Sequence, residues 1–250
     1  MAKRWDGYIS VVIYGKEADE DQLLSQVEAL WTKHEQSFNG KVAIHVVIDR
    51  RPKDDLYYPH NILRNIAMEN TPTDLLFYND IDFIPSYKAH SMLLKHIPSM
   101  PNDEPSVMVL PAFERKLQGN EDETKISLKD IPSNKASLMG NLITNDRIRP
   151  FRESYQPGHG PSNYTKWYTA TKAYQINFAL NYEPYFVVSK RWNLPPFWEH
   201  FTGYGKNKQT WVEEIGVAGF NFFVCPDAFI THVDHNNDKQ DDRYVVLLFL

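Results

Sequence analysis

The stretch Leu75-Leu76-Phe77-Tyr78-Asn79-Asp80-Ile81-Asp82 joins a short apolar run to two carboxylates. The apolar run is typical of a buried β-strand. Successive side chains of a strand point to opposite faces, so we expect Asp80 and Asp82 on one face and Ile81 turned back into the core. Two neighbouring carboxylates repel each other unless a cation lies between them. The pattern therefore predicts a divalent metal site, with an ordinary solvated strand end as the alternative.

Alternating strand and helix patterns precede this stretch. Residues 7–14 and 42–48 are short β-branched runs typical of buried strands, and residues 19–38 and 59–70 carry apolar side chains at helical spacing. With the strand that ends at the acid pair, the order is strand, helix, strand, helix, strand. This order predicts an α/β fold with a mostly parallel, Rossmann-like central sheet flanked by helices. Such sheets bind their ligands at the carboxyl ends of their strands.

The rest of the chain continues the same pattern. A helix is expected at 86–97, followed by strands at 106–112 and 185–188 and a strand pair within 220–230. Residues 115–150 are polar and weakly periodic, and we expect a mobile insertion there. The sequence has no internal repeat and no flexible linker, so one domain is predicted over the whole chain, residues 1–250.

Composition excludes several classes of protein. At 250 residues and 42% hydrophobic the chain can bury a substantial core, and a net charge of −5 without a basic stretch argues against nucleic-acid binding. Cys225 is the only cysteine, which excludes an internal disulfide and a cysteine-based metal site. No run reaches the roughly 20 apolar residues that span a bilayer, and no signal peptide is apparent. We expect a soluble chain.

Three further side chains are candidates for the site. Asn61 and Arg64 share one side of the predicted helix before the acid pair, where Arg64 could bind a phosphate or a base edge; an ordinary solvated arginine is the alternative. His232 follows an apolar strand-like run and is the candidate third metal ligand, since a histidine beside two aspartates suits Mn²⁺. His235 is interpreted as an ordinary core or surface histidine.

Seven motifs resemble one known family when they are taken in order. They are residues 58–67, 79–85, 111–114, 158–167, 182–185, 203–208 and 226–232. Together they resemble the glucuronyltransferase domain of LARGE-type xylosyl/glucuronyl-transferases and the related β-1,4-glucuronyltransferase, which form glycosyltransferase family 49. The similarity runs from about Trp5 to His235. The apolar tail at 244–250 is unlike the family's continuation.

The resemblance implies a GT-A fold, a Mn²⁺ cofactor and inverting transfer of glucuronic acid from the donor UDP-glucuronate to a glycan hydroxyl. It implies that Asp80, Asp82 and His232 are the metal ligands, and that Asn61 and Arg64, with Asp80, contact the nucleotide sugar. The 158–167 loop and the Gly203-Tyr204-Gly205 turn would border the sugar and the acceptor. It also implies the Golgi lumen, while the absence of an anchor leaves a cytoplasmic location open.

Two roles stay open among several residues. A carboxylate should accept the proton of the acceptor hydroxyl, and we favour Glu183 because a proline and a predicted strand follow it. The remaining candidates are Glu114, Glu213 and Glu214. A cation should bind the carboxylate of the donor, and the candidates are Lys166, Lys208 and Arg115.

Three other functions compete with glucuronyl transfer. The same site could use another nucleotide sugar such as UDP-xylose as the donor. Alternatively, the chain could be a module that binds a glycan without catalysing a transfer. A metal-dependent phosphohydrolase would use the same acid pair, but it needs further acidic or histidine ligands that the sequence lacks. The acceptor and the oligomeric state cannot be predicted from the sequence.

Overall fold

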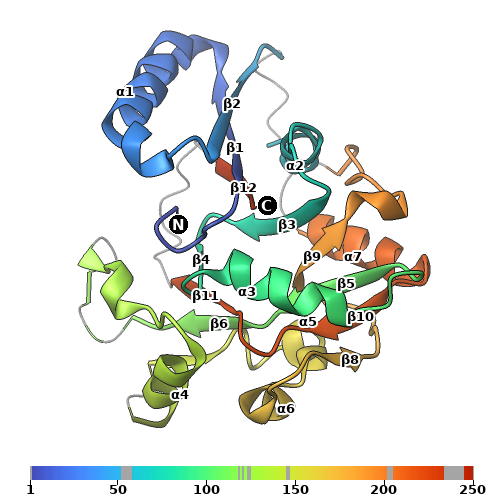
Figure 1. Cartoon of the computed structure of the whole chain (residues 1–250). Coiled ribbons are helices and arrows are strands. Elements are labelled where there is room, and N and C mark those ends of the chain that lie inside the picture. The colour runs from blue at the N-terminus through green and yellow to red at the C-terminus, as the bar shows by residue number, and fades with distance from the viewer. Residues whose placement is uncertain are drawn as a thin grey trace.

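The structure is a computed structural model that describes residues 2–51, 58–117, 119, 121–122, 125–144, 147–201, 205–233 and 245–249 (Figure 1). Within these ranges the α-helices are α1 Glu20–Phe38, α2 His60–Glu69, α3 Ala89–His96, α4 Lys135–Thr144, α5 Gln156–His159, α6 Tyr164–Thr169 and α7 Asn207–Val217. The strands are β1 Ile9–Lys16, β2 Val42–Asp49, β3 Leu75–Asp80, β4 Phe83–Pro85, β5 Ser106–Leu110, β6 Ala112–Arg115, β7 Ile148–Pro150, β8 Tyr174–Ile176, β9 Tyr185–Ser189, β10 Asn221–Val224, β11 Ile230–Val233 and β12 Val245–Phe249.

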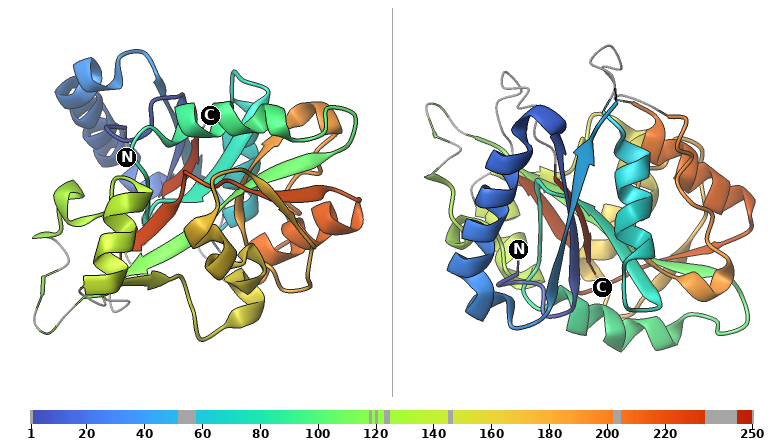
Figure 2. Two further views of the ribbon diagram at one scale, coloured as in Figure 1. Left: turned by 60° about the horizontal axis from the view of Figure 1, so that its bottom comes forward. Right: turned by 90° about the horizontal axis from the view of Figure 1, so that it is seen from above.

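Eight strands form the main sheet, in the order β2-β1-β12-β3-β9-β5-β10-β8. The predicted α/β class is confirmed, and β2, β1, β3, β5 and β10 all run in one direction. β12, β9 and β8 run the opposite way, and β12 and β9 separate β1, β3 and β5 from one another. The sheet is therefore mixed. Figure 2 shows α1 and α2 on either side of β1 and β2.

A second sheet of four strands, in the order β4-β11-β6-β7, continues from the first. Three segments of chain run from the large sheet into the small one: β3 into β4, β5 into β6 across Pro111, and β10 into β11. The predicted strand at 106–112 is therefore divided at this proline, which has no backbone N–H to donate. The carboxyl ends of β3, β5 and β10 meet at the junction of the two sheets.

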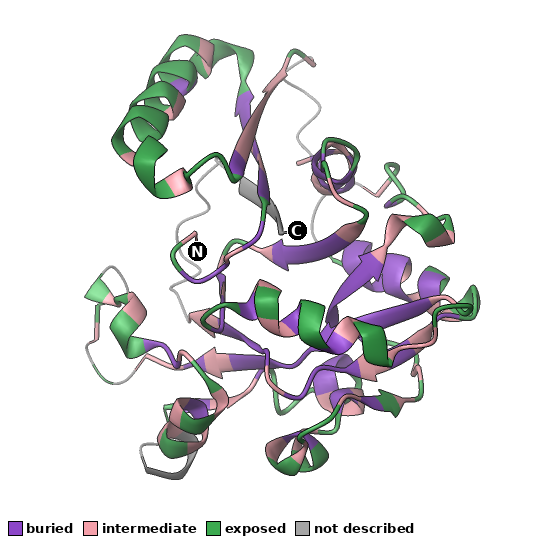
Figure 3. Ribbon diagram, viewed as in Figure 1, coloured by how far each residue is buried: buried purple, intermediate pink, exposed green. Residues whose placement is uncertain are grey.

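One hydrophobic core extends through both sheets. Val107, Met108 and Val109 of β5 and Phe113 of β6 are fully buried, and Figure 3 shows the burial concentrated in the central strands. Each large apolar side chain buried there contributes about 1.5–3 kcal/mol to folding. Helix α1 packs differently, since Leu23 is its one buried residue and most of the helix is exposed.

One sequence expectation needs correction. The Ile81 side chain is 49% exposed rather than buried, because β3 ends at Asp80 and residues 81–82 form a turn in which strand alternation no longer holds. Residues 115–150 contain β7 and α4, and the mobile insertion expected there stays a prediction.

The apolar tail has a definite place in the fold. Residues Val245–Phe249 form β12, which pairs antiparallel with β1 on one side and with β3 on the other. Val246 pairs with Asp80, so this strand supports the backbone of the acid pair. Among the described residues, no helix combines the length and apolar character needed to cross a membrane.

Candidate functional site

The acid pair lies in the short turn that joins β3 to β4. The side chain of Asn79 donates through Nδ2 to the carbonyl oxygens of Asp80 at 2.8 Å and Phe83 at 2.9 Å, and Asn79 itself is fully buried. These two bonds tie the last residue of β3 to the first residue of β4. Asn79 therefore fixes the turn that presents Asp80 and Asp82. Sequence reasoning missed this role, although asparagine beside a turn is a recognisable signal.

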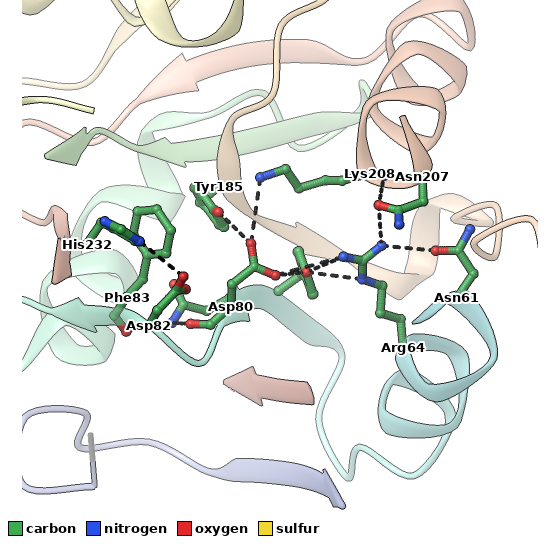
Figure 4. Close-up of polar contacts among 11 residues, drawn as sticks. Asn61, Arg64, Asp80, Asp82, Phe83, Tyr185, Asn207, Lys208 and His232 are labelled. Carbon is green, nitrogen blue, oxygen red and sulfur yellow. Dashed lines mark hydrogen bonds and ion pairs between the residues drawn. The ribbon is translucent and has the colours of Figure 1, made fainter. Parts of the chain in front are cut away.

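Asp80 is surrounded by hydroxyl groups and cations (Figure 4). Its carboxylate accepts hydrogen bonds from the hydroxyls of Tyr78 and of Tyr185, the second at 2.6 Å. Arg64 Nη2 lies 3.8 Å from Oδ1, and Lys208 Nζ lies 3.8 Å from Oδ2. Burial opposes the negative charge, but Lys208, Arg64 and the two hydroxyls outweigh it and hold the pKa of Asp80 below its ordinary value.

Arg64 is buried and fully engaged with protein groups. Its Nε and Nη2 donate to the hydroxyl of Tyr78 at 3.0 and 2.7 Å, and its Nη1 donates to the amide oxygens of Asn61 and Asn207, both at 3.0 Å. The guanidinium also lies over the ring of Phe197, 5.1 Å from its centroid. The helix side predicted to be polar does face the end of β3. In this structure, however, Arg64 binds neighbouring side chains and organises them.

The N-terminus of α7 brings Lys208 to the acid pair. Gly205 and Lys206 adopt positive φ angles of 105° and 53°, which turn the chain into the helix. Asn207 Oδ1 then accepts from the backbone N–H of Lys208 at 2.7 Å. Burial lowers the pKa of Lys208, while the nearby carboxylates, Asp80 first, oppose that shift. The structure thus brings Lys208, one of the three candidate cations, to Asp80. Gly203 and Tyr204 of the predicted turn lie outside the described residues.

Asp82 and His232 lie side by side on the other flank of Asp80. Asp82 Oδ2 is 3.1 Å from Nε2 of His232. The register of β11 opposite β4 pairs His232 with Phe83, and its ring packs against the rings of Phe83 and Phe151 at centroid distances of 5.1 and 5.0 Å. The second candidate histidine, His235, lies outside the described residues.

The side chains at the acid pair can be compared with the ligands that a divalent metal ion needs. Within the described ranges, no group of three or more His, Cys, Asp or Glu side chains is arranged to hold a metal ion. A carboxylate and an imidazole, as in Asp82 and His232, are donors that suit Mn²⁺. Cations that act on phosphates are often held by one or two protein ligands, with the phosphate oxygens and waters completing the shell. The pair therefore fits a cation shared with a bound diphosphate, with Asp80 beside it.

Glu183 and His159 act on the side chains that surround Asp80. The backbone N–H of Glu183 donates to the carbonyl of Gly158 at 2.8 Å, and its carboxylate acts on the charge of Lys208. The His159 ring stacks on Tyr185, with centroids 6.3 Å apart and an interplanar angle of 7°. Burial holds the pKa of His159 well below its ordinary value, so the ring is neutral. His159 lies in a motif that the sequence singled out, but its individual place was not predicted.

The other candidates for the base and for the cation that binds the donor make their described contacts with other residues. Lys166 is exposed on α6 with its ammonium 4.4 Å from the centroid of the Tyr174 ring, and its described contacts do not include the Asp80 cluster. Glu114 pairs with Arg149 at 3.0 Å, and buried Arg115 pairs with Glu121 at 2.5 Å. Glu213 accepts from the side chain of Gln209 at 3.0 Å. Glu214 is exposed on α7.

A second polar cluster lies where β1 and β2 end. Asp49 accepts from Arg51 Nε and Nη2, both at 2.9 Å, and from the hydroxyl of Tyr14. The Tyr58 ring packs edge-on against Tyr14 with a centroid distance of 5.0 Å. Hydrogen bonds from Arg51 lower the pKa of Asp49 despite burial. The sequence patterns did not identify this cluster, although an aspartate directly after a predicted strand was a signal that could have done so.

Comparison with known proteins places the chain among glycosyltransferases. It is 32% identical over 240 residues to human "Xylosyl- and glucuronyltransferase LARGE1", an alignment that covers 94% of this chain and 29% of that protein. It is 30% identical to the Caenorhabditis elegans "Glycosyltransferase-like protein LARGE", covering 97% of this chain and 37% of the relative. The Dictyostelium discoideum "Glycosyltransferase-like protein gnt14" is 31% identical, with 96% and 35% covered. The chain thus spans about a third of the length of these relatives.

The family comparison agrees with these relatives. Residues 51–244 match the model of a family described as "Glycosyl-transferase for dystroglycan". The matched range includes the acid pair, Glu183, Lys208 and His232. The chain therefore belongs to this glycosyltransferase family.

Proposed function

We propose that the chain transfers a sugar from a nucleotide donor to a hydroxyl group of a glycan, and that the donor is UDP-glucuronate. One observation carries the proposal: Asp80 and Asp82 meet His232 and Lys208 at the carboxyl end of β3, where α/β sheets bind their ligands. Carboxylates beside an imidazole suit a metal-bound diphosphate, and a buried ammonium suits further negative charge.

A divalent cation, most simply Mn²⁺, would be held by Asp82 and His232 with Asp80 beside them. When bound, it supplies a Lewis acid that stabilises the charge developing on the departing diphosphate. Asp82 and His232 are already adjacent, and Asn79 fixes the turn that carries the acid pair. These side chains therefore need little rearrangement to bind the cation.

The nucleoside would lie at the carboxyl ends of β1 and β2. Tyr14, Asp49, Arg51 and Tyr58 form a polar and aromatic cluster there, and it is next to the start of α2 along the chain. An aromatic face can stack on a base, while a carboxylate and a guanidinium can bind the ribose hydroxyls and base edges. Arg64, held by Asn61 and Asn207, would then shape the site between the nucleoside and the acid pair.

For an inverting transfer, the acceptor oxygen bonds to the anomeric carbon as the bond from that carbon to the UDP oxygen breaks. The acceptor proton must pass to a base, and Glu183 is the carboxylate proposed for this step because its charge acts on Lys208, which lies at Asp80. His159 is neutral and buried beside Tyr185, so it adds no charge there. Lys208, rather than the distant Lys166, is the proposed partner for an anionic group of the donor.

UDP-xylose is the second candidate donor, because relatives of this chain are named as both xylosyl- and glucuronyltransferases. Titration calorimetry with UDP-glucuronate, UDP-xylose and UDP-glucose, in Mn²⁺ and then in EDTA, distinguishes the donors. We expect Mn²⁺-dependent binding that favours UDP-glucuronate. Preference for UDP-xylose would identify the other donor. A folded protein that binds none of the three would be a glycan-binding module or a repurposed domain, contrary to the proposal.

A further inference from the structure

Lys208 lies inside the polar cluster rather than at its rim. Its ammonium is 3.8 Å from Asp80 Oδ2 and 3.9 Å from the centroid of the Tyr185 ring, and 11% of its side chain is exposed. The carboxylates of Glu183 and Asp82 also act on it. An ammonium out of water is stable only beside negative charge, so these carboxylates hold Lys208 in place.

The two cations at Asp80 are held in different ways. Arg64 is fixed by hydrogen bonds to Tyr78, Asn61 and Asn207 at 2.7 to 3.0 Å. The Lys208 ammonium is held by charge and by an aromatic face, at distances longer than a hydrogen bond. It also ends a flexible four-carbon stem. Lys208 can therefore leave Asp80 without breaking a hydrogen-bond network, and Arg64 cannot.

We propose that Lys208 is a movable counter-ion whose ammonium neutralises Asp80 in the empty site and moves to an anionic group of the donor when a divalent cation binds. The proposal rests on the proposed function, since it requires a metal beside Asp82 and a nucleotide-sugar donor. It assigns Lys208 a positioning role that couples the two ligands.

The coupling follows from charge. A cation that enters without a donor lies near a like charge that has no better partner, so it binds weakly. A donor supplies negative groups for both the cation and the ammonium, and each ligand then strengthens the other. Because such coupling is reciprocal, the metal must raise the affinity for the donor by the same factor. The anionic group is either the diphosphate or the carboxylate of the sugar.

The test compares Lys208→Met with the unsubstituted protein and with Lys95→Met, a control on the exposed side of α3. The dissociation constant of Mn²⁺ is measured by titration calorimetry alone and with UDP, UDP-glucose or UDP-glucuronate. Without nucleotide, we expect Lys208→Met to bind Mn²⁺ about tenfold more tightly, because a neighbouring like charge has been removed. Lys95→Met should match the unsubstituted protein.

The titrations with UDP, UDP-glucose and UDP-glucuronate identify the anionic group of the donor to which the Lys208 ammonium moves. If it joins the diphosphate, Lys208→Met weakens the coupling between Mn²⁺ and UDP itself. If it joins the carboxylate, the coupling is weakened with UDP-glucuronate and unchanged with UDP and UDP-glucose. Unchanged or weaker Mn²⁺ binding by a folded Lys208→Met, while the unsubstituted protein binds Mn²⁺, would overturn the counter-ion role. An unsubstituted protein that binds no Mn²⁺ under any condition would instead overturn the proposed metal site.

A second measurement applies if Lys208→Met does not fold. Lysines of the unsubstituted protein are ¹³C-methylated and observed by NMR, and Lys208→Arg identifies the signal of Lys208. Addition of Mg²⁺ and a nucleotide that binds should shift this signal, because the ammonium changes its partners. A Lys208 signal that stays in place while both ligands bind would contradict the proposal.

Discussion

Arg64 illustrates, at the scale of single residues, how the site is built into the fold. A sequence pattern placed it on the correct side of α2, but the pattern could not show that its guanidinium binds Tyr78, Asn61 and Asn207. Asn61 precedes Arg64 by one turn of α2, but Tyr78 belongs to β3 and Asn207 to α7, so only the tertiary structure brings these two to the guanidinium. Tyr78 and Tyr185 were missed for the same reason, because an aromatic residue in an apolar strand is normally interpreted as core.

Replacing Arg64 with alanine should therefore destabilise the protein as well as weaken nucleotide binding. Removal of this buried cation takes one of the two positive charges from Asp80 and one hydrogen-bond donor from each of the Asn61 and Asn207 amide oxygens, and we expect a loss of about 3 kcal/mol in the free energy of unfolding. Urea unfolding measures this loss, with exposed Arg191→Ala as the control. If Arg64→Ala were as stable as the unsubstituted protein, Arg64 would have no organising role. If a folded Arg64→Ala variant bound the nucleotide with unchanged affinity, α2 would be an ordinary amphipathic helix with no part in nucleotide binding.

Asp82→Asn tests the metal ligand itself. The amide keeps the shape of the side chain but removes its charge, so Mn²⁺-dependent binding of UDP should fall by at least ~100-fold while the fold is retained. Calorimetric titration of UDP in Mn²⁺ gives the affinity, and circular dichroism checks the fold. Binding of UDP as tight as in the unsubstituted protein would show that Asp82 is not a ligand.

At the scale of elements, local patterns predicted β1, β2, β3 and α2 close to their observed bounds. They could not predict which strands lie next to each other. β12 lies between β1 and β3 although about 165 residues separate it from β3, and pairing over that distance leaves no local trace in the sequence. Ile81 was misplaced because strand alternation was continued beyond the residue at which β3 ends.

Deletion of residues 245–250 tests the importance of β12. The deletion leaves β1 and β3 with unpaired backbone groups in the middle of the large sheet, so we expect loss of cooperative unfolding or a large drop in stability. Amide hydrogen exchange along β1 and β3, which pair with β12 from either side, reports the change directly. Unchanged protection along both strands in the shortened chain would contradict the central position of β12.

At the scale of the whole molecule, buried groups with lowered pKa values make stability depend on pH. Burial lowers the pKa of His60 to about 4, against an ordinary value of 6.5. The unfolded chain therefore binds this proton first, and stability falls as the pH drops from 6.5 toward 4. Below that range Asp49 and Asp80, whose pKa values are also lowered, lose their ionic contacts and destabilise the fold further.

Unfolding free energies measured between pH 7 and pH 4 should show this decline. In His60→Gln the decline above pH 4 should be smaller, since the variant has no imidazole to protonate there. Exposed His200→Gln serves as the control and should follow the unsubstituted protein. An unchanged pH profile in His60→Gln would show that His60 is not the group responsible.

The central claim is that the junction of the two sheets is a metal-assisted donor site, and anomalous diffraction from a crystal grown with Mn²⁺ and UDP tests it most directly. The account predicts a manganese peak in direct contact with Asp82 and His232, with the diphosphate of UDP on its open side. A manganese peak elsewhere, or UDP bound away from the carboxyl end of β3, would contradict it.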